Sequence, residues 1–560
     1  AGRDHWRTEV RTLVRDFRFL PGGRILAGAG TGRSVTLFNC FVMGHIRDSL
    51  DGIFDALKEG ALTMQQGGGI GNDFSTLRPA GTAAPSHGAI ASGPVSFMRI
   101  WDSMCATLLS TGNRRGAMMA TLRCDHPDIE AFIDAKRRPG ELRNFNLSVL
   151  VSDAFMTAVQ TDDEWHLVFP ADALAGTHGA LVRRRWSGSD RENPCRIVRT
   201  IRARALWDRL TQAAYDHAEP GVLFIDRINT ENNLAYREQI SATNPCGEIP
   251  LPAYGACNLG SVNLAKFVRS PFSTDAEIDW AALDNAVATG VRFLDNVIDV
   301  SDFPLTLQAD QARGSRRIGL GITGLGDMLI LLGLHYDSDA ARALAAKLMR
   351  HIRDSAYRTS IELAREKEGF PFLETESYLA GRFAGRLPAT LRDAIGRDGI
   401  RNSHLLAIAP TGTISLLANN VSNGLEPVYG FEYTRGVRQA DGEFRRHRVS
   451  DYAWRLFQRV RPGSGLSPAF VDALSLAPEA HLEMQAALQP FVDNAISKTI
   501  NVPTGLDLET FRRIFFRAWE LRLKGCTTFR PNAVTGDVLS PAPPGGQEAV
   551  HCCTLERESA

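Results

Sequence analysis

The sequence predicts an α/β fold, with one large body built from alternating strands and helices. Strand-like apolar runs alternate with helical segments, most regularly after Asp162. A chain of 560 residues can bury a large core. No internal repeat and no break in composition separates large independent domains, although several domains remain an alternative to a single body.

The first third of the chain begins with a charged helical segment, 1–17, that lacks the apolar core of a signal peptide. A glycine-rich turn at 20–30 and an apolar strand at 35–44 follow. A helix then starts near Asp48, which can cap it, and apolar residues continue at helical spacing from Leu50.

Two loops and a helix come next. The run 65–94 is rich in glycine and proline, and a loop of this length inside a globular body is often functional. A helix around 97–108 makes Cys105 a core residue, and a polar loop at 110–122 follows. The basic segment 184–204 is interpreted as a surface excursion.

The second half of the chain contains amphipathic helices at 278–300 and 340–368. A buried strand, 404–410, leads into the segment TGTISLLANN. The segment 318–334 predicts a buried strand, a glycine turn and a core helix. The tail 540–560 is rich in proline and glycine and is expected to be flexible.

The charge balance argues against nucleic-acid or membrane partners. Lys+Arg and Asp+Glu are equal at 63 each, so the chain has no overall basic field. The most apolar segment, 318–334, contains Asp327 and is shorter than the roughly 20 residues of a spanning helix. Phosphate recognition must therefore be local.

Cysteine usage indicates a reducing compartment, and hence the cytoplasm. An odd number of cysteines occurs in a long chain without a secretion signal. No C-x-x-C pair occurs, so a structural zinc site has little support. The nine cysteines are Cys40, Cys105, Cys124, Cys195, Cys246, Cys257, Cys526, Cys552 and Cys553.

The stretch NPCGE, 244–248, is the first candidate site. Alternate side chains of an extended segment share a face, so Asn244, Cys246 and Glu248 can present an amide, a thiol and a carboxylate to one ligand. A turn with an incidental core cysteine is the competing interpretation. The Asn-Pro-Cys at 193–195 lacks the carboxylate and lies in the basic surface-like stretch, so these three residues alone are weak evidence.

Two glycine-containing segments are candidate phosphate sites. In APTGTIS, 409–415, hydroxyls and free N–H groups at a helix start can bind an anion, although a plain capped helix would look the same. The run GGGIG at 67–71 allows close approach of the backbone to a ligand. Arg78, Arg114 and Arg115 lie on loops beyond it. Cys40, in FNCFVMG, reads by itself as a buried strand thiol.

Taken together, these segments resemble the catalytic chain of ribonucleotide reductases. The matching runs are FNCFV, DSLDGI, QQGGGIGNDFSTLRP, GNRRGAMMATLRCDHPDIEAFIDAKR, NFNLSV, NPCGEIPL, CNLGSVNL, RRIGLGITGLGDML, APTGTISLLANNVSNGLEPVY and KGCTTFRPN. The resemblance implies a ten-stranded α/β barrel of two five-stranded halves with a radical-cysteine loop inside. It would span 35–535, after an N-terminal helical region at 1–34 and before a flexible tail at 536–560.

The resemblance also implies residue roles. Cys246 would carry the thiyl radical that abstracts the 3′-hydrogen, Glu248 would be the base, and Asn244 would orient the ribose. Cys40 and Cys257 would be the reducing pair that ends as a disulfide, with Cys40 expected to protonate the departing 2′-hydroxyl. The residues implied in substrate binding are Asn39, Gly68, Gly69, Thr411, Gly412, Thr413 and Ser415.

The family binds a deoxynucleotide effector across a dimer interface. The resemblance places Asp48, Ser49, Leu50 and Arg78 at that site, and the loop carrying Arg114 and Arg115 between effector and substrate base. It further implies a homodimer and a thioredoxin-like or dithiol reductant. Cys552 and Cys553 could re-reduce the active-site disulfide, or that shuttle could lie in sequence outside this chain.

The radical source is expected to be adenosylcobalamin. Thr527 and Thr528 lie at or beside the position of the tyrosine pair of two-subunit reductases, and neither can relay a radical. The C-terminal signature of the glycyl-radical branch is missing from this sequence. A catalytic subunit served by a separate radical protein remains the runner-up. A nonenzymatic nucleotide sensor of the same fold is the alternative from another class.

Overall fold

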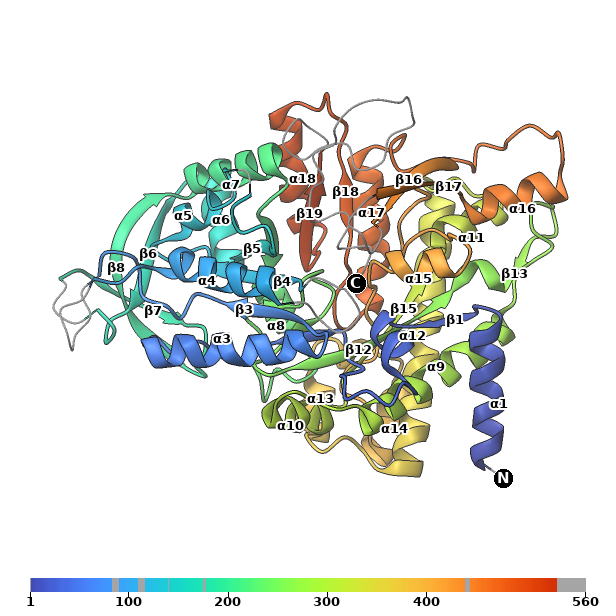
Figure 1. Cartoon of the computed structure of the whole chain (residues 1–560), viewed down its shortest axis with the longest axis horizontal. Helices are drawn as coiled ribbons and strands as arrows, with labels where there is room; N and C mark the ends of the chain where they lie inside the picture. The colour runs from blue at the N-terminus through green and yellow to red at the C-terminus, as the bar shows by residue number, and fades with distance from the viewer. Residues whose placement is uncertain are drawn as a thin grey trace.

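The centre of the fold is a mixed sheet of ten strands (Figure 1). The computed structural model describes residues 2–82, 90–108, 116–138, 140–174, 178–438 and 444–530. The sheet consists, in spatial order, of β1 (Phe19–Pro21), β12 (Ala256–Asn263), β2 (Cys40–Val42), β3 (Gly69–Asp73), β4 (Met118–Arg123), β5 (Phe145–Val151), β9 (Gly221–Phe224), β19 (Gly525–Phe529) and β18 (Thr499–Asn501), with β15 (Ile318–Thr323) also paired to β12.

The strand directions divide this sheet into two groups. Strands β2, β3, β4, β5 and β9 are mutually parallel. Strands β12 and β15 are parallel to each other, as are β18 and β19. The groups meet in antiparallel pairs, β2 with β12 and β9 with β19. Strand β1 adds an antiparallel edge to β12.

Two extended segments, 404–408 and 494–497, lie beyond β15. Ile318 N donates to His404 O at 3.0 Å, and isolated parallel bridges join Leu320 to Leu406 and Ile408 to Ile496. Ser497 N donates to Ile408 O at 2.8 Å. The first segment therefore lies between β15 and the second, and the second leads directly into β18.

Helices pack against both groups of strands. In Figure 1, α3 and α4 lie beside β3 and β4 at the left, and α9 packs on β12 and β15. The helices are α1 (Gly2–Arg15), α2 (Gly23–Gly28), α3 (Leu50–Gln65), α4 (Pro94–Thr107), α5 (Ile129–Ile133), α6 (Asp153–Thr161), α7 (Ala203–His217), α8 (Ile225–Thr230), α9 (Trp280–Val300), α10 (Thr306–Ser315), α11 (Leu325–Leu331), α12 (Asp339–Lys367), α13 (Thr375–Ala380), α14 (Ala389–Asp398), α15 (Gly412–Leu417), α16 (Tyr452–Val460), α17 (Pro478–Leu488) and α18 (Leu508–Glu520).

Smaller β elements complete the fold. Three strands, β6 (Glu164–Pro170), β8 (Glu192–Arg202) and β7 (Leu181–Arg185), form a separate sheet. The remaining strands pair as β10 (Ala242–Thr243) with β11 (Pro250–Leu251), β13 (Val268–Arg269) with β14 (Glu277–Ile278), and β16 (Glu432–Arg438) with β17 (Phe444–Ser450).

Several sequence predictions are confirmed. The amphipathic helices are α9 and α12, and Cys105 is buried in the main core. The apolar segment 318–334 forms β15, a turn at Gly324 with φ of 76°, and α11. Buried apolar side chains from both groups of strands join one large core cluster.

Other predictions are wrong. The predicted strand 35–44 shortens to β2, and the predicted loop 65–94 contains β3. The basic segment 184–204 lies mostly at the surface, as predicted, but it includes the end of β7 and all of β8, where Cys195 is buried against Phe169 and Trp186. Ser49, rather than Asp48, caps α3, because its side chain accepts from Gly52 N.

The hairpin β10–β11 projects against the sheet and carries the NPCGE stretch at its tip. A Cβ on Gly71 of β3 would lie 1.9 Å from Thr243 O, so only glycine permits this approach. Thr121 of β4 donates through Oγ1 to Ser241 O at 2.9 Å. From the other group of strands, Ala495 N donates to Glu248 O at 2.9 Å. Both groups therefore hold the hairpin.

Candidate active site

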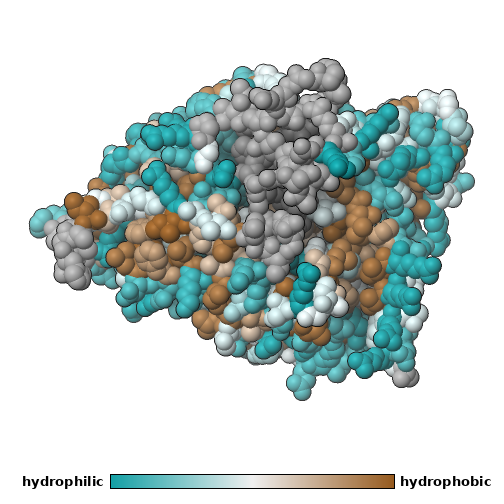
Figure 2. Space-filling view, in the orientation of Figure 1, coloured by the Kyte–Doolittle hydropathy of each residue, from teal (hydrophilic) through white to brown (hydrophobic). Residues whose placement is uncertain are grey.

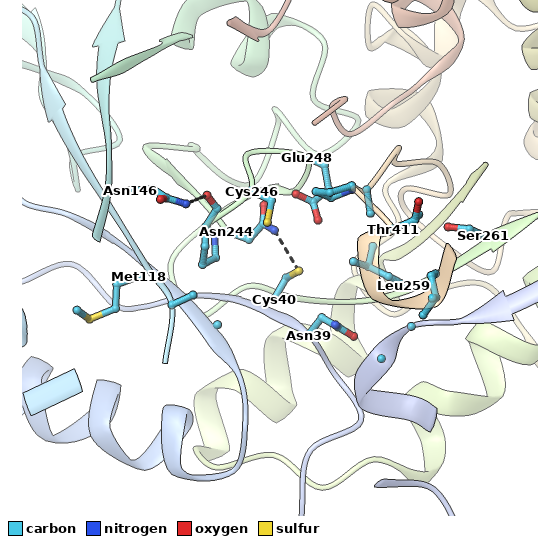
Figure 3. Close-up of a pocket in the computed structure, with 18 of the residues that line it drawn as sticks. Asn39, Cys40, Met118, Asn146, Asn244, Cys246, Glu248, Leu259, Ser261 and Thr411 are labelled. Carbon is cyan, nitrogen blue, oxygen red and sulfur yellow. Dashed lines mark hydrogen bonds between the residues drawn. The ribbon is translucent and has the colours of Figure 1, made fainter. Parts of the chain in front are cut away.

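A cavity of about 830 Å³ lies beside the hairpin tip (Figure 3). It is bounded by the tip, the start of β2, the middle of β12 and the chain that enters α15. Of the site residues predicted from sequence, those that line the cavity are Asn39, Cys40, Gly69, Asn244, Cys246, Glu248 and Thr411. Residues far apart in sequence therefore meet at one site.

The hairpin tip presents the expected amide, thiol and carboxylate to the cavity, from a turn and not from an extended segment. Asn244 accepts a hydrogen bond from Ile249 N at 3.0 Å through Oδ1, and its Nδ2 donates to Cys40 Sγ at 3.2 Å. Gly247, with φ of 81°, makes the turn. Cys246 is half-buried and Glu248 is 2% exposed. The site thus combines a thiol, a carboxyl group and an amide.

Cys40 and Cys257 are direct cross-strand partners in the antiparallel pair of β2 and β12. Directly opposite residues have Cβ atoms about 4.5–5.5 Å apart, slightly beyond the usual disulfide Cβ separation of about 3.5–4.5 Å, so a small shift would allow a disulfide. Both thiols are buried in this structure. Burial raises the pKa of Cys257 well above its ordinary value, which keeps its hydrogen on sulfur at neutral pH.

The predicted phosphate loop is only partly at the cavity. Thr411 lines it, in a left-handed conformation with φ of 58°. Its hydroxyl contacts Ser415 Oγ at 3.1 Å and Thr323 Oγ1 at 2.9 Å, and it accepts from Gly424 N at 2.8 Å. The cavity wall does not include Gly68, Gly412, Thr413 or Ser415.

Sequence reasoning missed several lining residues. Gly22 and Gly23, at the start of α2, line the cavity, and so does Ser261 of β12. The pair of glycines before a helical run is a usable signal for this approach, although by itself it predicts only a turn. Asn144 and Asn146 of NFNLSV also line the cavity, and the sequence by itself predicts no role for them.

A second cavity, of about 580 Å³, lies on another side of Cys246. Its wall shares Asn146, Pro245 and Cys246 with the first cavity. The rest of the wall includes Ser148, Glu219, Ser497, Lys498, Thr499, Gly525, Cys526 and Thr527. Cys246 therefore lines both cavities.

Lys498 is the buried cation of the second cavity. Its Nζ pairs with Glu426 and lies 2.8 Å from His481 Nδ1 and 2.9 Å from Thr499 O. Burial, and then the Lys498 charge, lower the pKa of His481 to about 2, so the ring is neutral and can accept from the ammonium. In the wall of the second cavity, the charge of Lys498 is therefore balanced by Glu426 and its position is fixed by hydrogen bonds.

Comparison with known proteins points to one family. The family model for the ribonucleotide reductase barrel domain matches residues 38–529. A vitamin B12-dependent ribonucleoside-diphosphate reductase of Mycobacterium tuberculosis is 38% identical over 557 residues, which cover 96% of this chain and 74% of the relative. One from Thermoplasma acidophilum is 34% identical over 96% of this chain and 66% of the relative. A ribonucleoside-diphosphate reductase large subunit of Vaccinia virus is 32% identical over 78% of this chain and 58% of the relative.

The chain belongs to the ribonucleotide reductase family. The resemblance inferred from the sequence motifs is thereby confirmed. None of the described helices of this reductase is long and apolar enough to cross a membrane.

The residues predicted at an effector site lie at the start of α3 in this reductase. Arg78 Nε donates to Asp48 Oδ2 at 2.7 Å, and Ser49 caps the helix. Leu50 is 65% exposed and Phe54 51% exposed, and Figure 2 shows hydrophobic residues gathered over α3 and α4. Arg114 and Arg115, like Cys552 and Cys553, lie outside the described residues.

Proposed function

We propose that this chain reduces ribonucleotides to 2′-deoxyribonucleotides with adenosylcobalamin as the radical source. The observation that carries the proposal is the convergence of Cys246, Asn244, Glu248 and Cys40 at one cavity, with Cys257 directly opposite Cys40 in the strand pair of β2 and β12. The match over nearly the whole chain to relatives named vitamin B12-dependent reductases supports the choice of cofactor.

Cys246 begins the reaction on the sugar. As a thiyl radical it removes the hydrogen from C3′ of the bound ribose. Glu248 takes the proton of the 3′-hydroxyl, and the amide of Asn244 orients the ribose hydroxyls. The hydroxyl at C2′ then leaves as water after taking a proton from Cys40. The acid, base and sulfur must converge on one sugar, and the hairpin tip and β2 supply them.

Cys40 and Cys257 provide the two electrons. Their sulfur atoms become joined as a disulfide while C2′ gains a hydrogen, and Cys246 finally returns the hydrogen to C3′ and recovers its radical. The overall reaction converts a ribonucleotide and a dithiol into a deoxyribonucleotide, a disulfide and water. An external dithiol or thioredoxin-like protein would then restore both thiols.

The substrate phosphates are assigned to the end of the cavity at Thr411. Gly412, Thr413 and Ser415 start α15, where backbone N–H groups can receive an anion. Asn39, Gly68 and Gly69 would contact the nucleoside from the start of β2 and β3. Asn39 supports this, since its buried Oδ1 makes no hydrogen bond among the described residues.

The second cavity fits the adenosyl part of the cofactor. Thr527, Gly525 and Gly247 keep side-chain volume low there, and Ser148, Thr499 and Glu219 offer partners for hydroxyl groups. When bound, adenosylcobalamin supplies a carbon-centred radical by homolysis of its cobalt–carbon bond. The thiol of Cys246, which borders this cavity as well as the first, needs no tyrosine relay.

The proposal includes closure of the sheet into the family's ten-stranded barrel over 35–535. The strands β2, β3, β4, β5 and β9 would form one parallel half. The other half would be β12, β15, the segment 404–408, the segment 494–501 with β18, and β19. The parallel bridges of Leu320 with Leu406 and Ile408 with Ile496 support this closure. In this division, 1–34 is a separate N-terminal region and 536–560 a tail.

The proposal also includes a cytoplasmic homodimer controlled by a deoxynucleotide. Asp48, Ser49, Leu50 and Arg78 would bind the effector beside the partner's α3. The exposed apolar face of α3 supports a dimer at this place. The loop with Arg114 and Arg115 would pass the effector signal to the substrate base.

The test is an assay of the purified chain with a ribonucleotide, a dithiol and adenosylcobalamin. Deoxynucleotide product is expected only when the cofactor is present, and no product from the lone chain would contradict the proposal. Cys246→Ala is expected to abolish turnover while nucleotide binding persists. A sensor without chemistry would instead behave identically with and without this substitution. Activity only after adding a separate radical-generating protein would favour the two-subunit alternative.

A further inference from the structure

The hairpin tip carries a hydrogen bond whose position bears on the radical cysteine. Asn146 of β5 donates through Nδ2 to Pro245 O at 2.7 Å (Figure 3). The carbonyl of Pro245 and the nitrogen and Cα of Cys246 belong to one planar peptide unit. A donor that fixes this carbonyl therefore fixes the plane from which the side chain of Cys246 projects.

The strand that supplies this donor is itself anchored. Asn144 donates from its backbone N to Asp102 Oδ1 at 2.9 Å, and from Nδ2 to the same oxygen at 3.0 Å. Asp102 lies on α4. Asn144, directly before β5, is thus tied to α4, and Asn146 reaches the hairpin from the start of the strand.

The opposite side of the tip has a second anchor. Glu248 O accepts from Ala495 N at 2.9 Å, in the segment before β18. The two external bonds thus hold carbonyls on either side of the Cys246–Gly247 turn. Gly247 adopts φ of 81° and adds no side chain that would restrain the turn.

Asn146 also borders both cavities that meet at Cys246. A rotation of the tip would turn the sulfur away from one of these spaces. We propose that Asn146 is a positioning residue that fixes the direction of the Cys246 sulfur, so that it serves both cavities. This inference rests on the proposed function for its catalytic consequence, but not for its geometry.

The test compares Asn146→Asp, which keeps the shape and removes the donor, with Asn146→Leu, which removes it without adding charge. Expected results are a fall in kcat of about tenfold to a hundredfold with KM within about twofold of wild type. Asn146→Gln, which keeps an amide donor, is expected to recover part of kcat. Asn296→Asp is the control, because this exposed asparagine accepts from Lys367 far from the hairpin.

A second readout needs neither cofactor nor turnover. Cys246 is half-buried, whereas the other described cysteines are buried, so iodoacetamide labelling of Cys246 can be followed by mass spectrometry. Both donor-free variants are expected to change this labelling rate several-fold, with Asn296→Asp unchanged. Wild-type labelling rates in folded variants would overturn the inference, even if kcat fell. If the wild-type chain made no deoxynucleotide, the proposed function would fail while labelling still decided the role of Asn146.

Discussion

At the scale of single residues, the proposed mechanism makes the supply of electrons depend on Cys40 and Cys257. Cys257→Ser removes one sulfur while Cys246, Asn244 and Glu248 stay in place. We expect wild-type enzyme, reduced and then given substrate and adenosylcobalamin without external dithiol, to form product together with a disulfide-linked Cys40–Cys257 peptide. The variant should form neither the peptide nor repeated turnover. Mass spectrometry of the digest measures the link.

The control for this prediction is Cys105→Ala, since Cys105 is a core thiol on α4 outside both cavities. It should retain the disulfide and the turnover of wild type. Sustained turnover of Cys257→Ser with a dithiol would show that the cross-strand pair is not the reductant.

Residue patterns predicted part of this site from sequence. Alternation along an extended segment predicted that Asn244, Cys246 and Glu248 share a face, and all three line the cavity, but they do so from the turn between β10 and β11. Alternation could not show that Cys40 lies opposite Cys257, because strand register between distant segments is set by tertiary packing. The donor Asn146 was equally hidden, since a lone asparagine in a strand has no pattern that reveals its partner.

At the scale of elements, the attachment of α16 to α11 depends on two buried carboxyl groups. Asp327 accepts from Ser422 N at 2.5 Å and Ala453 N at 2.7 Å, and Asp451 caps α16. Burial raises the pKa of Asp327 to about 6, and burial and the Asp327 charge raise the pKa of Asp451. Because the folded state favours the protonated carboxyl of Asp327, this group contributes to the free energy of unfolding fully below about pH 4. That contribution is lost as the pH rises through about 6.

Asp451→Asn should therefore stabilise the protein at neutral to alkaline pH. Asparagine caps a helix about as well as aspartate, and it removes the like charge beside Asp327. We expect the free energy of unfolding to rise by about 2 kcal/mol near pH 8 and by less near pH 5. Chemical denaturation at the two pH values measures this difference.

Asp507→Asn is the matched control, because Asp507 caps α18 by the same contact, to Thr510 N, without a like-charged partner. The pKa of Asp507 is lowered by that hydrogen bond. No gain near pH 8 is expected for it. An equal gain in both variants would attribute the effect to net charge instead of the buried pair.

Helices with a clear period in their apolar residues were predictable from sequence. A strand whose residues are set by close packing against another backbone segment was not. The 3.6-residue period of α9 and α12 shows in their sequences. Strand β3, Gly69–Asp73, has no such signal, since its glycines are required by the hairpin packed on them. Glycine-rich sequence without alternation normally indicates a loop, which explains the wrong prediction at 65–94.

At the scale of the whole molecule, the sequence predicted an α/β body but not its closure. The strand directions and the segments 404–408 and 494–497 rest on long-range pairing between short pieces of chain. Such pieces are too short for their own patterns to define a sheet order. The ten-stranded barrel therefore came from resemblance alone, and its closure stays a proposal.

The exposed surface of α3 predicts the interface of the proposed homodimer. Phe54 is 51% exposed and lies one turn from Leu50, so the two form an apolar stripe. In a twofold dimer the same stripe meets its copy, and one substitution acts twice. Phe54→Glu would place two unpaired carboxylates in that interface, and we expect it to weaken dimerisation by about a hundredfold or more.

Sedimentation velocity over a range of concentrations measures this change. Val300→Glu is the control, because Val300 is 71% exposed at the end of α9, away from α3. That variant should sediment as wild type does. If the effector site is shared across the dimer, Phe54→Glu should also lose the response of turnover to deoxynucleotides at concentrations where it is monomeric. A Phe54→Glu chain with wild-type sedimentation would place the dimer interface elsewhere, and an unchanged effector response in the monomer would confine the effector site to one chain.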